Sequence, residues 1–257
     1  MLLAINANNT NTKFALFEGD RLRVEWRAQT FGQRTADEYA VWLTHLMQLD
    51  GLGREAIDGA IIATVVPSAT FNLRGLCQRY FACEPLVVGA PGVDLGIRAL
   101  VDRPSEVGAD RLLNAIGGHR LFGGPLVVVD FGTATSFDVV DAEGNFRGGV
   151  IAPGINLSIE ALHMNTAQLP RIAPAKPAKV IGTDTIGCMQ SGVFWGYVGL
   201  IEGVVARIRA EWGSPMRVIS TGGLAPLFEG VTDCIERIVP DITMQGMLDV
   251  YRRNRKH

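Results

Sequence analysis

The chain has 257 residues, of which 24 are basic and 26 acidic, for a formal net charge of −2, and 47% of them are apolar. This length fits one large domain or two modest ones, and the balance of apolar and charged residues excludes a disordered chain. A net charge near zero gives no electrostatic reason to expect nucleic acid or a membrane surface as a partner. We therefore predict a globular protein that binds neither.

Four cysteines occur without the paired spacing of a zinc site and are too few for a disulfide framework in a chain of this length. The N-terminus has no signal-peptide pattern. Reduced thiols are typical of the cytoplasm, where we expect this protein to act. The cysteines are Cys77, Cys83, Cys188 and Cys234.

The first half of the chain predicts a β-β-β-α-β-α unit. Short apolar or alternating segments predict the strands, and polar residues mark the turns between them. The pattern from Thr35 to Glu38 is typical of a capping box that opens a helix. The predicted strands cover residues 2–5, 12–17, 22–26, 59–66 and 85–88, and the predicted helices cover 35–49, 69–81 and 107–121.

The same pattern starts again after residue 122. A buried strand, a polar turn and two further strands are followed by helices, a strand that ends in two glycines, another strand and a last helix. The predicted strands cover residues 126–129, 135–140, 146–152, 217–221 and 234–239, and the predicted helices cover 156–164, about 184–212 and 243 onward.

An internal duplication explains this repetition best, although strand-turn-strand segments recur in many mixed proteins. Residues 5–9 align with residues 129–133, because each segment is an apolar strand followed by a polar turn and a second strand. We predict an α/β fold of two duplicated domains, 1–122 and 123–257, with a cleft between them. Small polar turns facing such a cleft would let backbone amides approach phosphate closely, which favours nucleotide binding without a P-loop.

Two short segments are candidates for chemistry. In the turn after residue 129, Asp130 could hold a cation and Thr133 could donate to phosphate, or Asp130 could simply cap the hairpin. At the start of a predicted helix, Asp110 could accept a proton while Arg111 binds an anion. An acid in the first turn of a helix also has a purely structural explanation, because it interacts favourably with the helix dipole.

Four glycines lie on one face of the predicted helix 184–212. Their low helix propensity reduces the stability of the helix by about 4 kcal/mol relative to alanine. Very close helix packing is the natural compensation. The packing partner could be a second copy of the chain or another helix of the same chain. The glycines are Gly192, Gly196, Gly199 and Gly203.

Several longer motifs together resemble the type III pantothenate kinases of the acetate/sugar kinase, chaperone and actin superfamily, over essentially the whole chain. The motifs are Asn9-Thr-Asn-Thr12, Val107-Gly-Ala-Asp-Arg111, Val129-Asp-Phe-Gly-Thr-Ala-Thr135, Gly149-Val-Ile-Ala-Pro-Gly-Ile155, Met189-Gln-Ser-Gly-Val-Phe-Trp-Gly-Tyr197 and Thr221-Gly-Gly-Leu-Ala-Pro226. The resemblance implies two actin-like (ribonuclease H-like) domains. It also implies ATP-dependent phosphorylation of pantothenate to 4'-phosphopantothenate, the first step of coenzyme A biosynthesis.

The resemblance further implies a homodimer that uses Mg2+ and a monovalent cation, K+ or NH4+. It makes Asp110 the catalytic base, Asp130 the ligand of the monovalent cation and Thr133 a contact of ATP. The implied pantothenate contacts are Gly108, Ala109, Asp110, Arg111 and Thr185. The implied phosphate loop consists of Asn6, Ala7, Asn8, Asn9, Thr10, Asn11, Thr12 and Lys13.

Three positions depart from the family's pattern. The family's first turn usually contains an acid and a glycine where this chain has Asn6 and Asn8, and many members have a tyrosine in the pantothenate pocket where this chain has Val101. Asn6 keeps an oxygen but lacks the charge that attracts Mg2+, while asparagine tolerates the left-handed backbone that a glycine would adopt. The alternative hypothesis is therefore a catalytically impaired or non-catalytic homologue with a binding or regulatory role.

Overall fold

The computed structural model describes residues 1–255, so the last two residues of the predicted second domain lie outside it. The chain forms two compact units, and each contains one five-stranded sheet. Unit 1 consists of residues 1–98, 103–117 and 243–257, and unit 2 consists of residues 99–102 and 118–242.

In unit 1 the strand order is β3-β2-β1-β4-β5. The central strand β1 pairs antiparallel with β2 and parallel with β4. The strands are β1 (Leu2–Ala7), β2 (Asn11–Glu18), β3 (Arg21–Gln29), β4 (Gly59–Thr64) and β5 (Leu86–Val87). The helices of this unit are α1 (Ala36–Leu49), α2 (Pro67–Tyr80), the first part of α3 (Ala109–Phe122) and nearly all of α6 (Ile242–Asn254).

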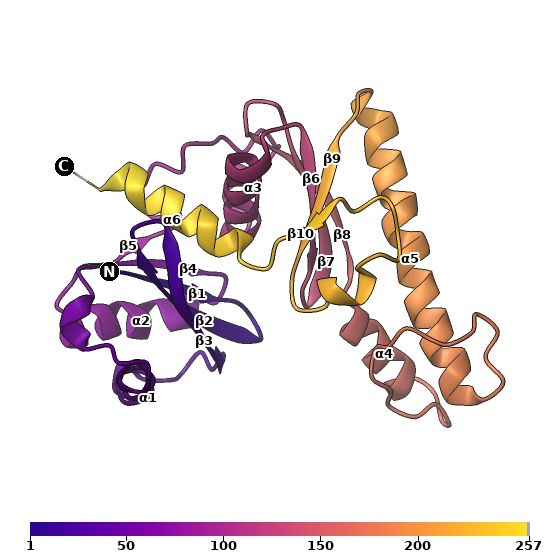
Figure 1. Ribbon diagram of the computed structural model, residues 1–257, viewed down its shortest axis with the longest axis horizontal. Coiled ribbons are helices and arrows are strands. Elements are labelled where there is room, and N and C mark those ends of the chain that lie inside the picture. Colours follow the sequence, from indigo (N-terminus) through magenta and orange to yellow (C-terminus); the bar gives the residue numbers. More distant parts are fainter. Residues whose placement is uncertain (256–257) are drawn as a thin grey trace. The chain divides into compact units, whose positions relative to one another are not determined.

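Helices cover both faces of the unit 1 sheet, which explains why β1 and β4 are apolar throughout. Leu3 and Ile5 of β1 pack with α1 and α2, whereas Leu2 and Ala4 pack with Leu113 of α3 and with α6. Figure 1 shows α1 and α2 on one side of this sheet and α6 on the other. Side chains of a strand alternate between the two faces, so Asn6 belongs to the face that α3 and α6 cover.

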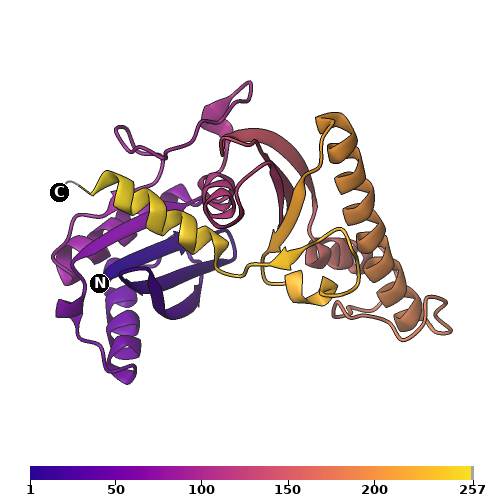
Figure 2. The same ribbon diagram turned by 45° about the horizontal axis from the view of Figure 1, so that its top comes forward.

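In unit 2 the order is β10-β9-β6-β7-β8, which repeats the arrangement of unit 1 with β6 in the place of β1. The strands are β6 (Leu126–Phe131), β7 (Ala134–Val140), β8 (Phe146–Pro153), β9 (Arg217–Thr221) and β10 (Arg237–Ile238). Two helices, α4 (Ile155–Met164) and α5 (Thr185–Trp212), contribute to its core. In both views α5 runs alongside the sheet (Figures 1 and 2).

The duplicated α/β fold predicted from the sequence is confirmed, with four local differences. The first strand of each unit extends past the predicted end, to Ala7 and Phe131, because its last residues still pair with the antiparallel neighbour. Helix α2 begins at Pro67, since proline suits the first turn of a helix. The predicted strand 234–239 shortens to two residues. Two 3-10 turns, Arg54–Ala56 and Pro104–Glu106, lie where no helix was predicted.

The compact units differ from a simple division between residues 122 and 123. The chain passes from unit 1 to unit 2 within α3, and residues 243–257 belong with unit 1. The apolar side chains of α6, among them Met244, Met247 and Leu248, are buried against β1, β4 and α3. This burial explains why the end of the chain belongs with unit 1. The predicted domain boundary and the predicted cleft stay predictions.

One helix in residues 1–255, α5, is long and apolar enough by length and composition to cross a membrane, with a third (33%) of its most apolar window buried. Its buried side chains, such as Phe194 and Ile201, belong to the core of unit 2. A core helix of a globular protein passes the same test, so this property by itself is weak support for a membrane span.

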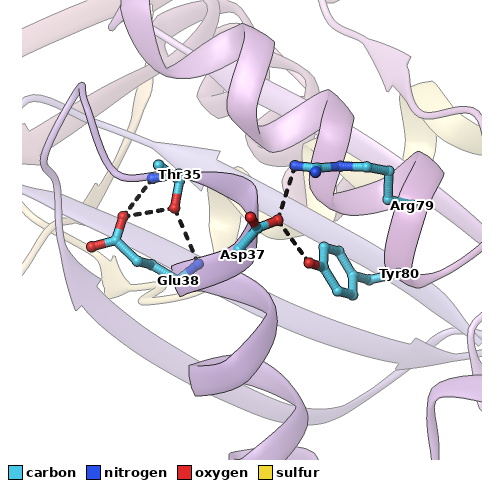
Figure 3. Close-up of polar contacts among 5 residues, drawn as sticks. All are labelled: Thr35, Asp37, Glu38, Arg79 and Tyr80. Atoms are coloured by element: carbon cyan, nitrogen blue, oxygen red, sulfur yellow. Dashed lines mark hydrogen bonds and ion pairs between the residues drawn. The ribbon is translucent and has the colours of Figure 1, made fainter.

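The start of α1 carries the capping box that the sequence predicts (Figure 3). Glu38 accepts hydrogen bonds from the backbone N–H of Thr35 at 2.7 Å and from its hydroxyl at 2.8 Å. These bonds lower the pKa of the Glu38 carboxyl. Next to the box, Asp37 accepts a hydrogen bond from Tyr80 at 2.7 Å and pairs with Arg79 at 3.1 Å, which joins α1 to the end of α2.

We predict that Thr35→Ala lowers the free energy of unfolding by about 1 kcal/mol, the usual cost of losing a cap. A lowered carboxyl pKa contributes stability above the pKa of the unfolded chain and loses it as the pH falls through the folded value. The difference between Thr35→Ala and the wild type should therefore shrink in acid. Urea unfolding across pH measures both effects. Thr44→Ala, which removes a hydroxyl bonded to Ala40 within the same helix, is the matched control. If Thr35→Ala and Thr44→Ala lower the free energy of unfolding equally, the prediction is contradicted.

Candidate functional site

The first turn of unit 1 joins β1 to β2, and its predicted site residues fall partly in the strands. Asn6 and Ala7 are buried at the end of β1, and Asn6 lies directly opposite Lys13 of β2. The turn itself consists of residues 8–10. Paired residues of an antiparallel ladder point to the same face of the sheet. The side chains of Asn6 and Lys13 therefore lie next to each other.

Backbone hydrogen bonds shape this turn without left-handed residues. The N–H of Asn8 donates to the carbonyl of Asn11 at 3.0 Å, and the N–H of Thr30 donates to that of Thr10 at 2.9 Å. Asn8 does not have a positive φ, so the tolerance of asparagine for left-handed backbone is not needed at this turn. The antiparallel pairing of β1 with β2 is sufficient to close the turn.

The turn carries polar side chains. Asn9, Thr10 and Asn11 are exposed, whereas Thr12 is buried and its hydroxyl lies 2.8 Å from that of Thr30. The side-chain oxygen of Asn8 is buried without a hydrogen-bond partner. An unpaired buried acceptor in a loop calls for a donor from outside the chain. A bound nucleotide with its water shell would supply one.

Asp110 belongs to the same unit. It lies in the first turn of α3, where the N–H of Arg111 donates to its carboxylate at 2.9 Å. A Cβ added to Gly108 would come within 3.8 Å of Val65, which follows directly after β4. Val65 is hydrogen-bonded to Ala7, the last residue of β1. The start of α3 therefore lies at the edge of the sheet where the first turn lies, over the face that carries Asn6 and Lys13.

Unit 2 carries the second predicted turn at the equivalent edge. Asp130 lies in β6 rather than in the turn, between Ser136 of β7 and Thr221 of β9. A Cβ added to Gly132 would come within 3.7 Å of the Asp130 carboxylate, so the turn bends back over this side chain. Thr133 is exposed, and its carbonyl accepts a hydrogen bond from Gly154 at 3.1 Å.

Two further polar side chains next to Asp130 were missed by the sequence analysis. Asp138 is fully buried, and Ser136 donates to its carboxylate at 3.2 Å. Residues 136 and 138 share a face of β7, and the register of β6 against β7 puts Asp130 on that face too. The alternation of polar residues along residues 135–140 was the available signal, and only the strand register connects it to Asp130.

Thr185 and Val101 make no direct contact with these turns within residues 1–255. Thr185 is exposed at the first position of α5, next to its N-cap Asp184. Val101 lies beside β8, 3.6 Å from a Cβ added to Gly148. Residues 1–255 hold no group of three or more His, Cys, Asp or Glu side chains that could bind a metal ion. For a cation, Asp130 is the carboxylate at the second turn, whereas residues 6–13 at the first turn offer amide and hydroxyl oxygens but no carboxylate.

Two sheets of the same strand order, each with a polar turn after its central strand, define the actin-like fold of ATPases and sugar kinases. A similar fold occurs in the crystal structure of (R)-2-hydroxyglutaryl-CoA dehydratase component A from Acidaminococcus fermentans. That structure has a TM-score of 0.53 and 13% identity, and the match covers 97% of this chain and 96% of that one.

The chain belongs to the type III pantothenate kinase family, whose model matches residues 2–207. It is 61% identical over 254 residues to the type III pantothenate kinase of Paramagnetospirillum magneticum, which covers 99% of this chain and 98% of the relative. The type III pantothenate kinase of Rhodospirillum rubrum is also 61% identical over 254 residues and covers 99% of both chains. The predicted family is thereby confirmed.

The glycine pair after β9 generates a stability prediction. Gly222 has a φ of +95°, and a Cβ there would come within 2.6 Å of the backbone of Phe131, next to Asp130. Gly223 has open space around its Cβ position. We expect Gly222→Ala to lower the free energy of unfolding by about 2 kcal/mol through strain and displacement of β6. Gly223→Ala should change it by less than about 0.5 kcal/mol. Equal unfolding midpoints in urea for the two variants would contradict this account.

Proposed function

We propose that this chain transfers the terminal phosphoryl group of ATP to the hydroxyl group of pantothenate, in the first step of coenzyme A biosynthesis, with Asp110 as the base. Family membership over the full chain is the observation that carries the activity and the enzyme class. No observation favours the alternative of a non-catalytic homologue. The residue roles below are proposals that the geometry of each unit supports.

Asp110 and Arg111 serve the acceptor. Phosphoryl transfer is mostly positioning and charge neutralisation, so the acceptor needs an oriented hydroxyl and a nearby base. The carboxylate of Asp110 takes the hydroxyl proton, and the guanidinium of Arg111 binds the carboxylate of pantothenate. Both are half-buried at the start of α3. Backbone groups of Gly108 and Ala109, together with Thr185, complete the proposed contacts of pantothenate.

The two turns serve ATP. Residues 6–13 contact its phosphates from unit 1, and Thr133 contacts them from unit 2. Asp130 holds the monovalent cation, K+ or NH4+, with a carboxylate that a hard cation prefers. When bound with ATP, Mg2+ supplies further positive charge against the phosphate oxygens. The buried, unpaired oxygen of Asn8 supports a ligand at the first turn.

The chain acts as a homodimer in the cytoplasm, and α5 supplies the dimer contact. Outside its own helix turn, a Cβ added to Gly192, Gly196 or Gly199 meets no atom of residues 1–255 within 4 Å, so no other described helix packs closely against these three glycines. That open space supports a contact with a second copy of the chain at these three glycines. The groove beside it, about 560 Å³ between α4 and α5, is lined by apolar side chains such as Met189, Val193 and Leu162.

We predict that the purified protein forms phosphopantothenate from ATP, Mg2+, K+ and pantothenate, and that Asp110→Asn lowers kcat by 10²–10⁴-fold, the usual contribution of a general base. Asp233→Asn, an exposed carboxylate elsewhere, should leave the rate unchanged. A coupled assay of ADP release measures both variants. A wild type that makes no product under varied metal and cation would overturn the proposed activity and favour the non-catalytic homologue.

Asp130→Asn should abolish the stimulation of the kinase rate by K+ or NH4+, because the neutral amide no longer attracts the cation. The comparison is the ratio of rates with K+ and with a large organic cation at equal ionic strength. A ratio near one in the variant and well above one in the wild type is the expected outcome. The same ratio in both proteins would remove Asp130 from the cation site.

Sedimentation should give the wild type twice the chain mass of 27.7 kDa, and Gly196→Glu should sediment as a monomer. The glutamate has open space in the single chain, so the monomer should remain folded. Gly196→Ala, which adds only a methyl group, is the milder comparison. A wild-type monomer, or a Gly196→Glu dimer, would exclude this face of α5 as the contact.

A further inference from the structure

The first turn of unit 1 carries an unusual charge for a place that binds a metal-nucleotide complex. Three positions stand in one row across the sheet: Asn6 of β1, Lys13 of β2 and Arg27 of β3. Asn6 is nearly buried (3% exposed) and neutral. The row therefore presents an amide and two cations to the edge of the sheet, and no carboxylate.

The carboxylate of Glu25, two residues before Arg27 on β3, is already paired. Glu25 lies 3.6 Å from the ammonium group of Lys13 and 3.4 Å from the guanidinium of Arg27. The cluster of these three side chains has a net charge of +1. A divalent cation is repelled by this charge, whereas a triphosphate is attracted to it. The residues present at the first turn thus do not fit direct coordination of Mg2+.

We propose that the ammonium group of Lys13 neutralises the negative charge of the ATP phosphates at the first turn. A carboxylate at position 6 would hold a divalent cation for this purpose, whereas Asn6 does not. This inference rests on the proposed function, because it assigns the phosphates of ATP to the first turn. The inference goes further than the proposed function in one respect. The turn binds phosphate oxygens through the ammonium group of Lys13, so the chain does not require a divalent cation to bind ATP.

The side chain of Lys13 can move from Glu25 toward the first turn with little loss of interaction free energy. Its ion pair with Glu25 is long at 3.6 Å and partly exposed, with 25% of each side chain accessible. Such pairs contribute about 0 to 1 kcal/mol. When the ammonium group moves toward the turn, Arg27 remains as the partner of Glu25, so no carboxylate is left without a cation. The four-carbon stem of lysine allows the movement, because Asn6 is its direct neighbour across the ladder.

The amide of Asn6 completes the arrangement. A carboxylate at this position would form a salt bridge with Lys13, since the two residues are register partners. The neutral amide leaves the ammonium group available for phosphate, and its N–H2 group is a second donor. Asn6 and Lys13 therefore act together as positioning residues for the phosphates, and each explains the presence of the other.

Calorimetric titration of the full-length protein with ATP, once with EDTA and once with Mg2+, tests the proposal without any turnover. We expect the wild type to bind metal-free ATP within about tenfold of MgATP, a difference of 1.4 kcal/mol. Lys13→Met should weaken the binding of metal-free ATP by tenfold or more and that of MgATP less. Lys13→Arg should keep most of the metal-free binding, because it keeps the charge.

Two comparisons make the result specific. Asn6→Asp should bind metal-free ATP more weakly than the wild type, because the new carboxylate occupies Lys13 and repels phosphate, and its binding should depend more steeply on Mg2+. Arg54→Met removes a positive charge from the 3-10 turn that precedes β4, at the other end of the sheet, and should bind both forms like the wild type. Circular dichroism and thermal unfolding report whether each variant is folded.

The proposal is overturned if the wild type binds ATP only with Mg2+, a result that needs no variant, or if Lys13→Met binds metal-free ATP as well as the wild type. These outcomes are independent of the kinase assay. A wild type that phosphorylates pantothenate but needs Mg2+ for all ATP binding would keep the proposed function and reject the role of Lys13. If the protein has no kinase activity but binds metal-free ATP through Lys13, the role of Lys13 is kept and the proposed function is rejected.

Discussion

The site residues of both units depend on one constraint, the pairing of a central strand with an antiparallel neighbour on one side and a parallel neighbour on the other. Such a strand is buried on both faces and must be apolar along most of its length. Only its last residues, at the edge where the parallel strands end, can carry polar side chains. Asn6 occupies that position in β1 and Asp130 in β6, and the strand register decides which side chains stand beside them.

The two units use this common position with opposite charge. In unit 1 the row beside Asn6 carries Lys13, whereas in unit 2 the face of Asp130 carries Ser136 and the buried Asp138. A positive row suits an anion, and a carboxylate next to hydroxyl groups suits a cation. The two units thus place side chains of different charge on the same backbone geometry.

Much of the fold could be predicted from the sequence because it depends on local patterns. Apolar runs marked β1, β4 and β6, and the Thr35–Glu38 pattern marked the start of α1. The ends of the strands were less predictable, since a polar residue such as Asn6 continues a strand when both neighbours offer hydrogen bonds. Asp138 was missed for the same reason: its connection to Asp130 exists only through the register of two strands.

The sequence alone determined the duplicated element order, the family and the motifs that contain Asp110 and Asp130, because these follow from the order of residues along the chain. The tertiary structure decided which residues share a face and what surrounds them. It placed Lys13 beside Asn6 and the start of α3 at the same sheet edge, and it left open space beside Gly192, Gly196 and Gly199 of α5 among the described residues. The physical reason is that strand register and helix packing bring together side chains far apart in the chain, and no local pattern encodes those distances.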